Sequence, residues 1–206
     1  ILDWSGIELR TWAQACMDLL GQSKMADALN GSRDPHTEIG LALTEGRTVS
    51  DEEFKLTYRQ AGKIANFGLP GGMGVDAFTV MARKSHNVHM ERPLAEAVRA
   101  AWFEAWDGRA YFNAVTNIIE ADPSIYLARS GRTRGRVSFT QACNTLFQGP
   151  ASDLAKAAGY RMTKQCFLGG GPLYYSRIVA FVHDEYLLEV PEEIGHECAM
   201  EGKRIM

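Results

Sequence analysis

Three carboxylates lie beside or inside apolar segments at the two ends of this 206-residue sequence. Asp3 follows two apolar residues, and Asp184 and Glu185 interrupt the apolar stretch from 178 to 190. A carboxylate is costly in such a place unless it is paired or binds a cation, and a set of hard oxygen ligands suits Mg²⁺. Two such ions could activate a hydroxyl nucleophile and stabilise a leaving phosphate. Taken singly, each acid is more often an ordinary carboxylate at a strand end or turn.

A second group of side chains could bind an anionic, partly aromatic ligand. Arg59, Lys63 and Phe67 follow one another at intervals of four residues, which puts them on one face of a helix. Two cations and a ring on one face could hold a triphosphate and stack on its base or sugar. The spacing alone favours a plainer interpretation, namely a solvated basic stripe beside a core phenylalanine.

Arginines are concentrated in one short segment that contains no acid. Arg129, Arg132, Arg134 and Arg136 alternate there with small or polar residues, glycine among them. Such a cluster could contact a phosphate backbone, and it could equally be a solvated loop. Both interpretations stay open.

These side chains must be positioned by a largely helical α+β fold with one small antiparallel sheet. Ser50 and Glu53 form a capping box that starts the helix carrying Arg59, and the glycines after Phe67 end it. The apolar run, acidic tip and second apolar run at 177–190 predict a β-hairpin. Since strands are expected only at the beginning of the chain and near its end, the first strand and this hairpin would have to meet in one small sheet. The other expected elements are a strand running into a helix over 1–20, helices over 36–45, 75–83, 93–116, 139–159 and 194–206, and loops over 21–35, 131–137 and 169–172.

Composition narrows the class of protein. The sequence is 46% hydrophobic and 23% charged, which is typical of a globular domain. Its net charge of −3 requires any nucleic-acid surface to be local. The four cysteines form no C-x-x-C pair, so reduced thiols are expected rather than a zinc ribbon or disulfide framework. No apolar run reaches the roughly 20 residues of a membrane span, and no signal segment is present. We therefore expect a cytoplasmic protein with no membrane partner.

The segments that carry this chemistry resemble the motifs of the family A DNA polymerases. Residues 3–10 read DWSGIELR, similar to the family's motif A, usually DYSQIELR. Residues 59–68 fit the R-x-x-x-K-x-x-N-F-G pattern of motif B on the fingers O-helix, and 183–185 read HDE like motif C. Residues 148–153 resemble the family's Q-G-x-A-A-D segment, and 34–36 its D-x-H segment. The motifs occur in the family's order over nearly the whole chain.

The resemblance implies a function and a role for each matched residue. It implies template-directed DNA synthesis, in which two Mg²⁺ ions serve transfer of dNMP from dNTP to a primer 3′-hydroxyl. The implied partners are a DNA primer-template and dNTP; oligomeric state is left open. The implied catalytic and metal-binding groups are Asp3, Asp184, the Trp4 carbonyl and, on the primer side, Glu185. His36, Arg59 and Lys63 would contact the phosphates of the nucleotide. Phe67 would contact its sugar, and Glu8 would act as the steric gate beside the sugar. The implied DNA contacts are Asn144, Gln148 and His183. Arg132, Arg134 and Arg136 are added as DNA contacts from their charge.

The resemblance also implies boundaries and departures. Residues 1–35 and 126–206 would form the palm and 36–125 the fingers, with the O-helix at about 50–68 and no thumb. The sequence begins at Ile1 inside a strand, so we expect a piece of a longer protein, poorly active by itself, from a bacterium or a phage-infected host. Gly71 stands where the family usually has a tyrosine, and Gly6 where motif A has glutamine. The alternatives are a single-subunit RNA polymerase, against which Glu8 and Phe67 argue, and a catalytically weak nucleic-acid-binding fragment.

Overall fold

The computed structural model describes residues 1–206 and divides into two compact units. One unit consists of residues 1–7 and 150–206, and the other of residues 8–149. Helix α9 (Phe139–Leu168) contributes to both. All four cysteines are free and buried. No helix combines the length and apolar character that crossing a membrane requires.

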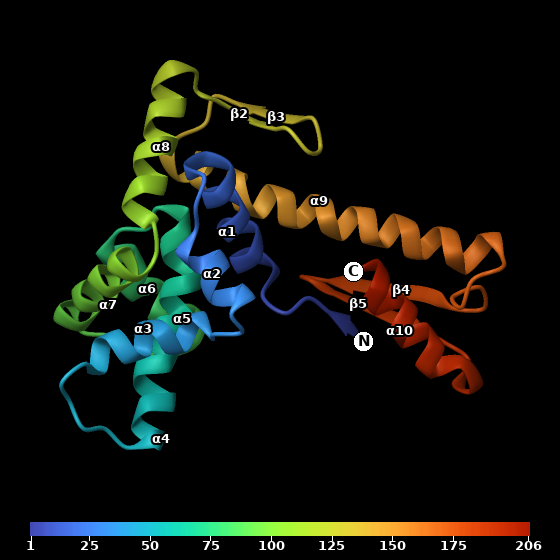
Figure 1. Ribbon diagram of the computed structural model, residues 1–206, viewed down its shortest axis with the longest axis horizontal. Coiled ribbons are helices and arrows are strands. Elements are labelled where there is room, and N and C mark those ends of the chain that lie inside the picture. Colours follow the sequence, from blue (N-terminus) through green and yellow to red (C-terminus); the bar gives the residue numbers. More distant parts are fainter. The chain divides into compact units, whose positions relative to one another are not determined.

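The smaller unit is built on a three-stranded antiparallel sheet that joins the two ends of the chain (Figure 1). Strand β5 (Glu185–Glu189) lies in the centre, between β1 (Leu2–Asp3) and β4 (Arg177–Val182). The predicted hairpin is therefore confirmed, and so is its pairing with the first strand. A two-residue turn joins β4 to β5, because Val182 pairs with Glu185. His183 in that turn has a positive φ of 56°.

Tyr186 ties this sheet to the helices beside it. Its ring stacks on Phe181 and meets Trp4 edge to face, and its hydroxyl donates a 2.8 Å hydrogen bond to the carbonyl of Ala155 in α9. The Trp4 indole donates to the carbonyl of Met206 (3.1 Å), just after the final helix α10 (Gly195–Ile205), which follows the short helix η3 (Glu192–Ile194). The contacts of Tyr186 thus attach β5 to α9 on one side and to Trp4, which is bonded to the end of α10, on the other.

The Tyr186 hydroxyl reaches α9 only because Gly159 has no side chain. A Cβ at Gly159 would overlap that hydroxyl. We expect Gly159→Ala to lower the free energy of unfolding by about 2 kcal/mol, the usual cost of overpacking a filled core. Denaturant unfolding measures this. Gly135→Ala is the matched control, because its Cβ would meet nothing closer than 3.7 Å; equal stability losses in the two variants would contradict the assignment.

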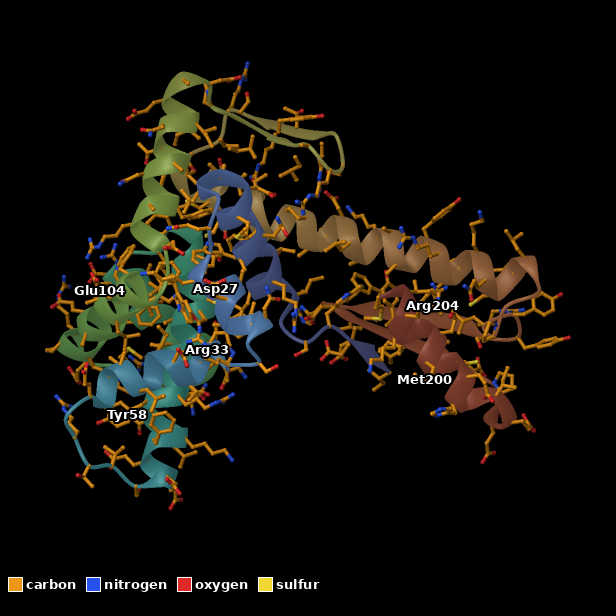
Figure 2. All side chains as sticks on the ribbon, in the orientation of Figure 1. Asp27, Arg33, Tyr58, Glu104, Met200 and Arg204 are labelled. Atoms are coloured by element: carbon orange, nitrogen blue, oxygen red, sulfur yellow. The ribbon has the colours of Figure 1, made fainter.

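The larger unit is mostly helical. Its core contains Trp12, whose ring lies 5.4 Å from Trp102 and 5.6 Å from Tyr111. Figure 2 shows the side chains on this framework, with Tyr58 labelled at the end of the π-helical turn from which α5 continues. The elements before α9 are α1 (Ile7–Leu20), α2 (Lys24–Asn30), α3 (Pro35–Thr44), α4 (Asp51–Glu53), η1 (Phe54–Tyr58), α5 (Arg59–Gly68), η2 (Leu69–Gly71), α6 (Val75–His86), α7 (Arg92–Ala105), α8 (Gly108–Ala121), β2 (Ser124–Leu127) and β3 (Arg132–Gly135).

Helices α3 and α5 approach each other closely, and this contact positions His36. A Cβ at Gly62 would overlap the carbonyl of His36, so only glycine allows the two backbones to pack at this distance. Upstream, Ser50 caps α4, which leads into α5, as predicted, and accepts a 3.2 Å hydrogen bond from the Glu53 backbone N–H. The helix is not regular throughout, because residues 54–58 form a π-helical turn.

Three predicted segments differ from the structure. The expected loop at 21–35 contains α2, because Ser23 caps a short helix that buries Met25 and Ala28. The expected helix at 93–116 is two helices, since Trp106 is extended after α7 and Asp107 turns away to accept the backbone N–H of Lys24 (2.8 Å). The helix expected to end near residue 159 runs to Leu168, with Pro150 inside it.

The arginine segment expected to be a loop forms strand β3, antiparallel to β2. Arg134 is opposite Ile125 and Arg132 is opposite Leu127, both of which are buried. Cross-strand partners share a face of the hairpin, so the two arginines lie on its packed side. The pattern of charges did not show this, because arginine stems can cover apolar surface while the guanidinium stays at the edge. The predicted palm and fingers boundaries follow sequence motifs rather than compactness, and they stay predictions.

Candidate active site

Asp3, Asp184 and Glu185 gather at one end of the sheet. Asp3 is the cross-strand partner of Glu185, and Asp184 precedes Glu185 in the hairpin turn. Cross-strand partners share a face, so Asp3 and Glu185 lie on the same side of the sheet. The chain ends are brought together at these residues, as the sequence required.

The degree of burial of these acids differs from expectation. Asp3 is exposed, and Asp184 and Glu185 are half-buried. The expected cost of burying them is therefore small, and it gives no reason by itself to infer a cation. What fits Mg²⁺ is the chemistry of the donors, since carboxylate oxygens at adjacent positions are its usual ligands. No group of three or more acidic, histidine or cysteine side chains is already arranged as a metal site.

The second candidate group lies on α5 in the larger unit. Lys63 is half-buried and Phe67 is 36% exposed, whereas Ile64, Ala65 and Asn66 next to them are buried. Phe67 is therefore not a core residue, and the plainer interpretation of this helix face is wrong on that point. The Phe67 ring packs against His36, with 5.7 Å between the ring centroids.

Asp34 organises the start of α3 and connects it to α5. Its carboxylate accepts hydrogen bonds from the His36 backbone N–H (3.1 Å), the Thr37 hydroxyl (2.7 Å) and the Arg59 Nε (2.8 Å). Burial alone would raise the pKa of Asp34, but these bonds hold it below its usual value. An ion pair with Asp34 thus fixes Arg59 beside His36. Of the two cations on this helix face, Lys63 is the one that contributes less to holding the helices together.

The environment of His36 keeps its imidazole neutral. Burial lowers the pKa of His36; Asp34 raises it, while Arg59 and Lys63 lower it further, and the net shift is downward. The unfolded chain therefore binds this proton more tightly than the folded chain does. It follows that protonation favours unfolding as the pH falls below about 6.5, the ordinary pKa of histidine.

We accordingly expect the stability of the wild type to decrease as the pH falls below that value, and the decrease to be smaller in His36→Gln. Urea unfolding at a series of pH values measures the difference. His89→Gln is the control, because His89 is exposed and pairs only with Glu91. Parallel stability curves for wild type and His36→Gln would contradict the shift.

Several of the residues expected to contact sugar and DNA have hydrogen-bond partners within the larger unit. Gln148 Nε2 donates a 3.2 Å hydrogen bond to Glu8 Oε1, which joins the predicted steric gate to a predicted template or primer contact. Arg132 donates to the carbonyl of Gly149 (2.9 Å), and Arg134 donates to the Thr145 hydroxyl (3.0 Å). Both arginines therefore hold the hairpin on α9 whatever else they bind. Arg136 and His183 are exposed and have positive φ values of 55° and 56°.

Comparison with known proteins identifies the family. The profile described as DNA polymerase family A matches residues 1–206. The chain belongs to DNA polymerase family A. Among its relatives, DNA polymerase I of Streptococcus pneumoniae R6 is 28% identical over 92% of this chain and 21% of its own length. That of Helicobacter pylori J99 is 28% identical over the whole chain and 22% of its own length. The chain thus spans about a fifth of these relatives.

The fold agrees with this family membership. The POL domain of Pol1 from M. smegmatis, solved with DNA primer-template and dNTP, superimposes with a TM-score of 0.70. It is 23% identical, and the match covers 99% of this chain and 36% of that one. The mixed helical fold with small antiparallel sheets is therefore a family A polymerase fold, as the sequence motifs implied.

One departure from the family's motif B has a structural counterpart. Gly71 ends η2 where the family usually has tyrosine, and a Cβ there would lie 2.6 Å from Asn144 Oδ1. The Asn144 amide, which donates to the Thr140 carbonyl (2.9 Å), therefore occupies the space beside Gly71. A larger residue at position 71 must displace it.

We expect Gly71→Ala to shift the side-chain amide resonances of Asn144 while the free energy of unfolding changes by less than about 1 kcal/mol, because the obstructing group is a side chain that can rotate. A ¹H–¹⁵N spectrum of the variant measures this. Gly74→Ala is the control, since nothing lies within 4 Å of its Cβ position. An unmoved Asn144 amide in Gly71→Ala would show that the contact is absent.

Two buried residues of the site were missed from the sequence. Asn66 is 1% exposed and its amide contacts His36, and Trp106 is 3% exposed and contacts Asn66. Asn66 lies inside the family A motif, so the motif itself was a signal. Nothing in the sequence around Trp106 marks it as part of a site 40 residues away.

Proposed function

We propose that this chain carries out template-directed DNA synthesis, adding dNMP from a dNTP to the 3′-hydroxyl of a primer on a DNA template. The observation that carries the proposal is the register that pairs Asp3 with Glu185, the residue after Asp184, in a chain that belongs to DNA polymerase family A. The solved relative from M. smegmatis binds DNA primer-template and dNTP, and we propose the same partners here.

In the proposed reaction, the primer 3′-oxygen attacks the α-phosphorus of the dNTP in line. A P–O bond forms to the primer, the bond to the departing pyrophosphate breaks, and the hydroxyl proton is lost. Asp3, Asp184 and the Trp4 carbonyl would hold two Mg²⁺ ions, with Glu185 on the primer side. When bound, such ions acidify the attacking hydroxyl and neutralise charge on the leaving oxygen. The carboxylates and carbonyl contribute by fixing where that charge is neutralised.

The incoming nucleotide would be held by the exposed face of α5 and by His36. Lys63 and Arg59 supply positive charge for the phosphates, and His36 supplies a hydrogen-bond donor. Phe67, exposed beside His36, offers a ring face to the sugar. These groups come from two helices whose close contact at Gly62 fixes their spacing, so the phosphates would meet a preformed surface.

Glu8 would exclude ribonucleotides by occupying the space of a 2′-hydroxyl. Its hydrogen bond to Gln148 holds the carboxylate in one position, which a steric gate requires. This favours a DNA polymerase over the single-subunit RNA polymerase considered from sequence. We also propose that Asn144, Gln148, His183 and the arginines of β3 contact the primer-template, that residues 1–35 and 126–206 act as palm and 36–125 as fingers, and that the protein works in the cytoplasm.

The test is incorporation by the complete gene product on a labelled primer-template, with dNTPs and rNTPs compared. We expect template-dependent extension with dNTPs, discrimination against rNTPs of at least about a hundredfold, and loss of much of that discrimination in Glu8→Ala. Extension with rNTPs as efficient as with dNTPs would favour the RNA polymerase. Primer-template binding with no extension by either would leave only a binding protein.

A further inference from the structure

A chain of three polar side chains runs from the core of the larger unit to the candidate phosphate site. The Trp106 indole N–H donates a 3.1 Å hydrogen bond to Asn66 Oδ1. Asn66 Nδ2 lies 3.1 Å from His36 Nδ1. Trp106 and Asn66 are almost completely buried, and His36 is half-buried. This series of hydrogen bonds therefore connects Trp106 in the core to His36, which is partly accessible.

The indole fixes the orientation of the amide. An indole nitrogen can only donate, so the Asn66 atom that faces it must be the oxygen. The amide nitrogen is then the atom that faces His36. This removes the ambiguity that affects most asparagine side chains, whose nitrogen and oxygen are otherwise difficult to tell apart.

The amide in turn fixes the tautomer of His36. An amide nitrogen donates, so Nδ1 of His36 must accept and cannot carry a proton. The proton of the neutral ring is then on Nε2. A doubly protonated ring would place an N–H against the amide N–H, which is unfavourable and leaves both donors without an acceptor.

We propose that Asn66 and Trp106 are positioning residues that hold His36 as a neutral imidazole with its proton on Nε2, so that this nitrogen is a ready hydrogen-bond donor to a phosphate oxygen. The identity of the ligand rests on the proposed function. The tautomer rests only on the hydrogen bonds of the folded chain.

The charges around His36 also favour the neutral imidazole overall. Arg59 and Lys63 on α5 disfavour a third positive charge, and only Asp34, whose carboxylate is already bonded to Arg59, favours one. A triphosphate would therefore meet two cations and one neutral donor. The orientation of that donor does not change with pH near neutrality, so a correctly directed N–H is available before the ligand arrives.

The test is ¹⁵N NMR of histidine-labelled complete gene product, which distinguishes the two neutral tautomers and the cation directly. His36→Gln identifies the His36 signals by their loss. We expect the Nε2–H tautomer at neutral pH in the wild type and titration below the ordinary histidine value. An Nδ1–H tautomer, or a charged ring at pH 7, would overturn the proposal without any further variant.

Two substitutions then test the relay, the series of hydrogen bonds from Trp106 through Asn66 to His36. Asn66→Asp replaces the donor facing Nδ1 by an acceptor, so we expect His36 to take a proton on Nδ1 and to titrate at higher pH. Trp106→Phe keeps a ring but removes the indole donor, so the amide can turn and we expect a mixture of tautomers. His89→Gln, at an exposed histidine, should leave the His36 signals unchanged. An unchanged His36 spectrum in a folded Asn66→Asp or Trp106→Phe variant would refute the relay.

Kinetics separate this inference from the proposed function. In a working polymerase we expect Asn66→Asp to raise the KM for dNTP about tenfold at pH 8, the loss of one good hydrogen bond, with a smaller effect on kcat. If the NMR result is as expected but dNTP does not bind, the proposed function fails and the tautomer stands. If dNTP binds but the ring is the other tautomer, the relay fails and the proposed function stands.

Discussion

Asp184→Asn is expected to lower the rate of dNMP incorporation by about a thousandfold or more. The change keeps the size and polarity of the side chain but removes the negative charge proposed to hold both Mg²⁺ ions. Loss of one group that stabilises developing charge typically costs two to three powers of ten, and groups that act together cost more. Single-turnover extension of a labelled primer by the complete gene product measures the rate. Asp3→Asn should have a similar effect, because the two acids would act on the same ions.

Glu189→Gln is the matched control. Glu189 is exposed at the other end of the same strand, opposite Arg177, so it shares the sheet but not the acidic end. We expect near wild-type extension from this variant, and primer-template affinity in Asp184→Asn equal to or tighter than in the wild type, since a negative charge has been removed. Substantial activity in Asp184→Asn would exclude Asp184 from the reaction.

Lys63→Met is expected to lower kcat/KM for dNTP about a hundredfold. Methionine keeps much of the aliphatic stem but has no charge, and a charged hydrogen bond to a phosphate is commonly worth that much in a partly buried position. Arg59 is a less specific probe, because its ion pair with Asp34 also holds α3 to α5. Steady-state kinetics with varied dNTP at saturating primer-template measures the change.

A second readout shows whether the effect comes from charge. Lys63 lowers the pKa of His36, so Lys63→Met should raise the pH at which His36 titrates. Lys84→Met, at an exposed lysine of α6, should change neither quantity. An unchanged kcat/KM in Lys63→Met would mean that the α5 face is a solvated basic stripe after all.

The ends of the chain were easier to predict than its middle. The two apolar runs on either side of Asp184 and Glu185 predicted a hairpin, and the strand that carries Asp3 was expected to meet it in one small sheet. The register that pairs Asp3 with Glu185 was not predicted, because continuous apolar runs do not fix which residues lie opposite one another. The expected burial of these acids was wrong, since an acid at a sheet end can stay exposed even when its neighbours in sequence are apolar.

Contacts between residues distant in sequence could not be predicted. The α7–α8 break at Trp106 depends on Asp107 accepting a backbone N–H from Lys24, far away in sequence. The charge pattern of the arginines did not reveal that Arg132 and Arg134 also bond to residues within α9. Asn66 and Trp106 have roles that depend on a helix packing against His36, and helical periodicity marks such residues only as core.

The most direct test of the central claim is diffraction from crystals of the complete gene product bound to primer-template and a non-hydrolysable dNTP, soaked with Mn²⁺ in place of Mg²⁺. Anomalous scattering locates manganese independently of any assumption about its ligands. We predict two anomalous peaks, each within coordination distance of the carboxylates of Asp3 and Asp184. Manganese bound elsewhere, with these two carboxylates making no contact to it, would contradict the assignment of the metal-binding pair.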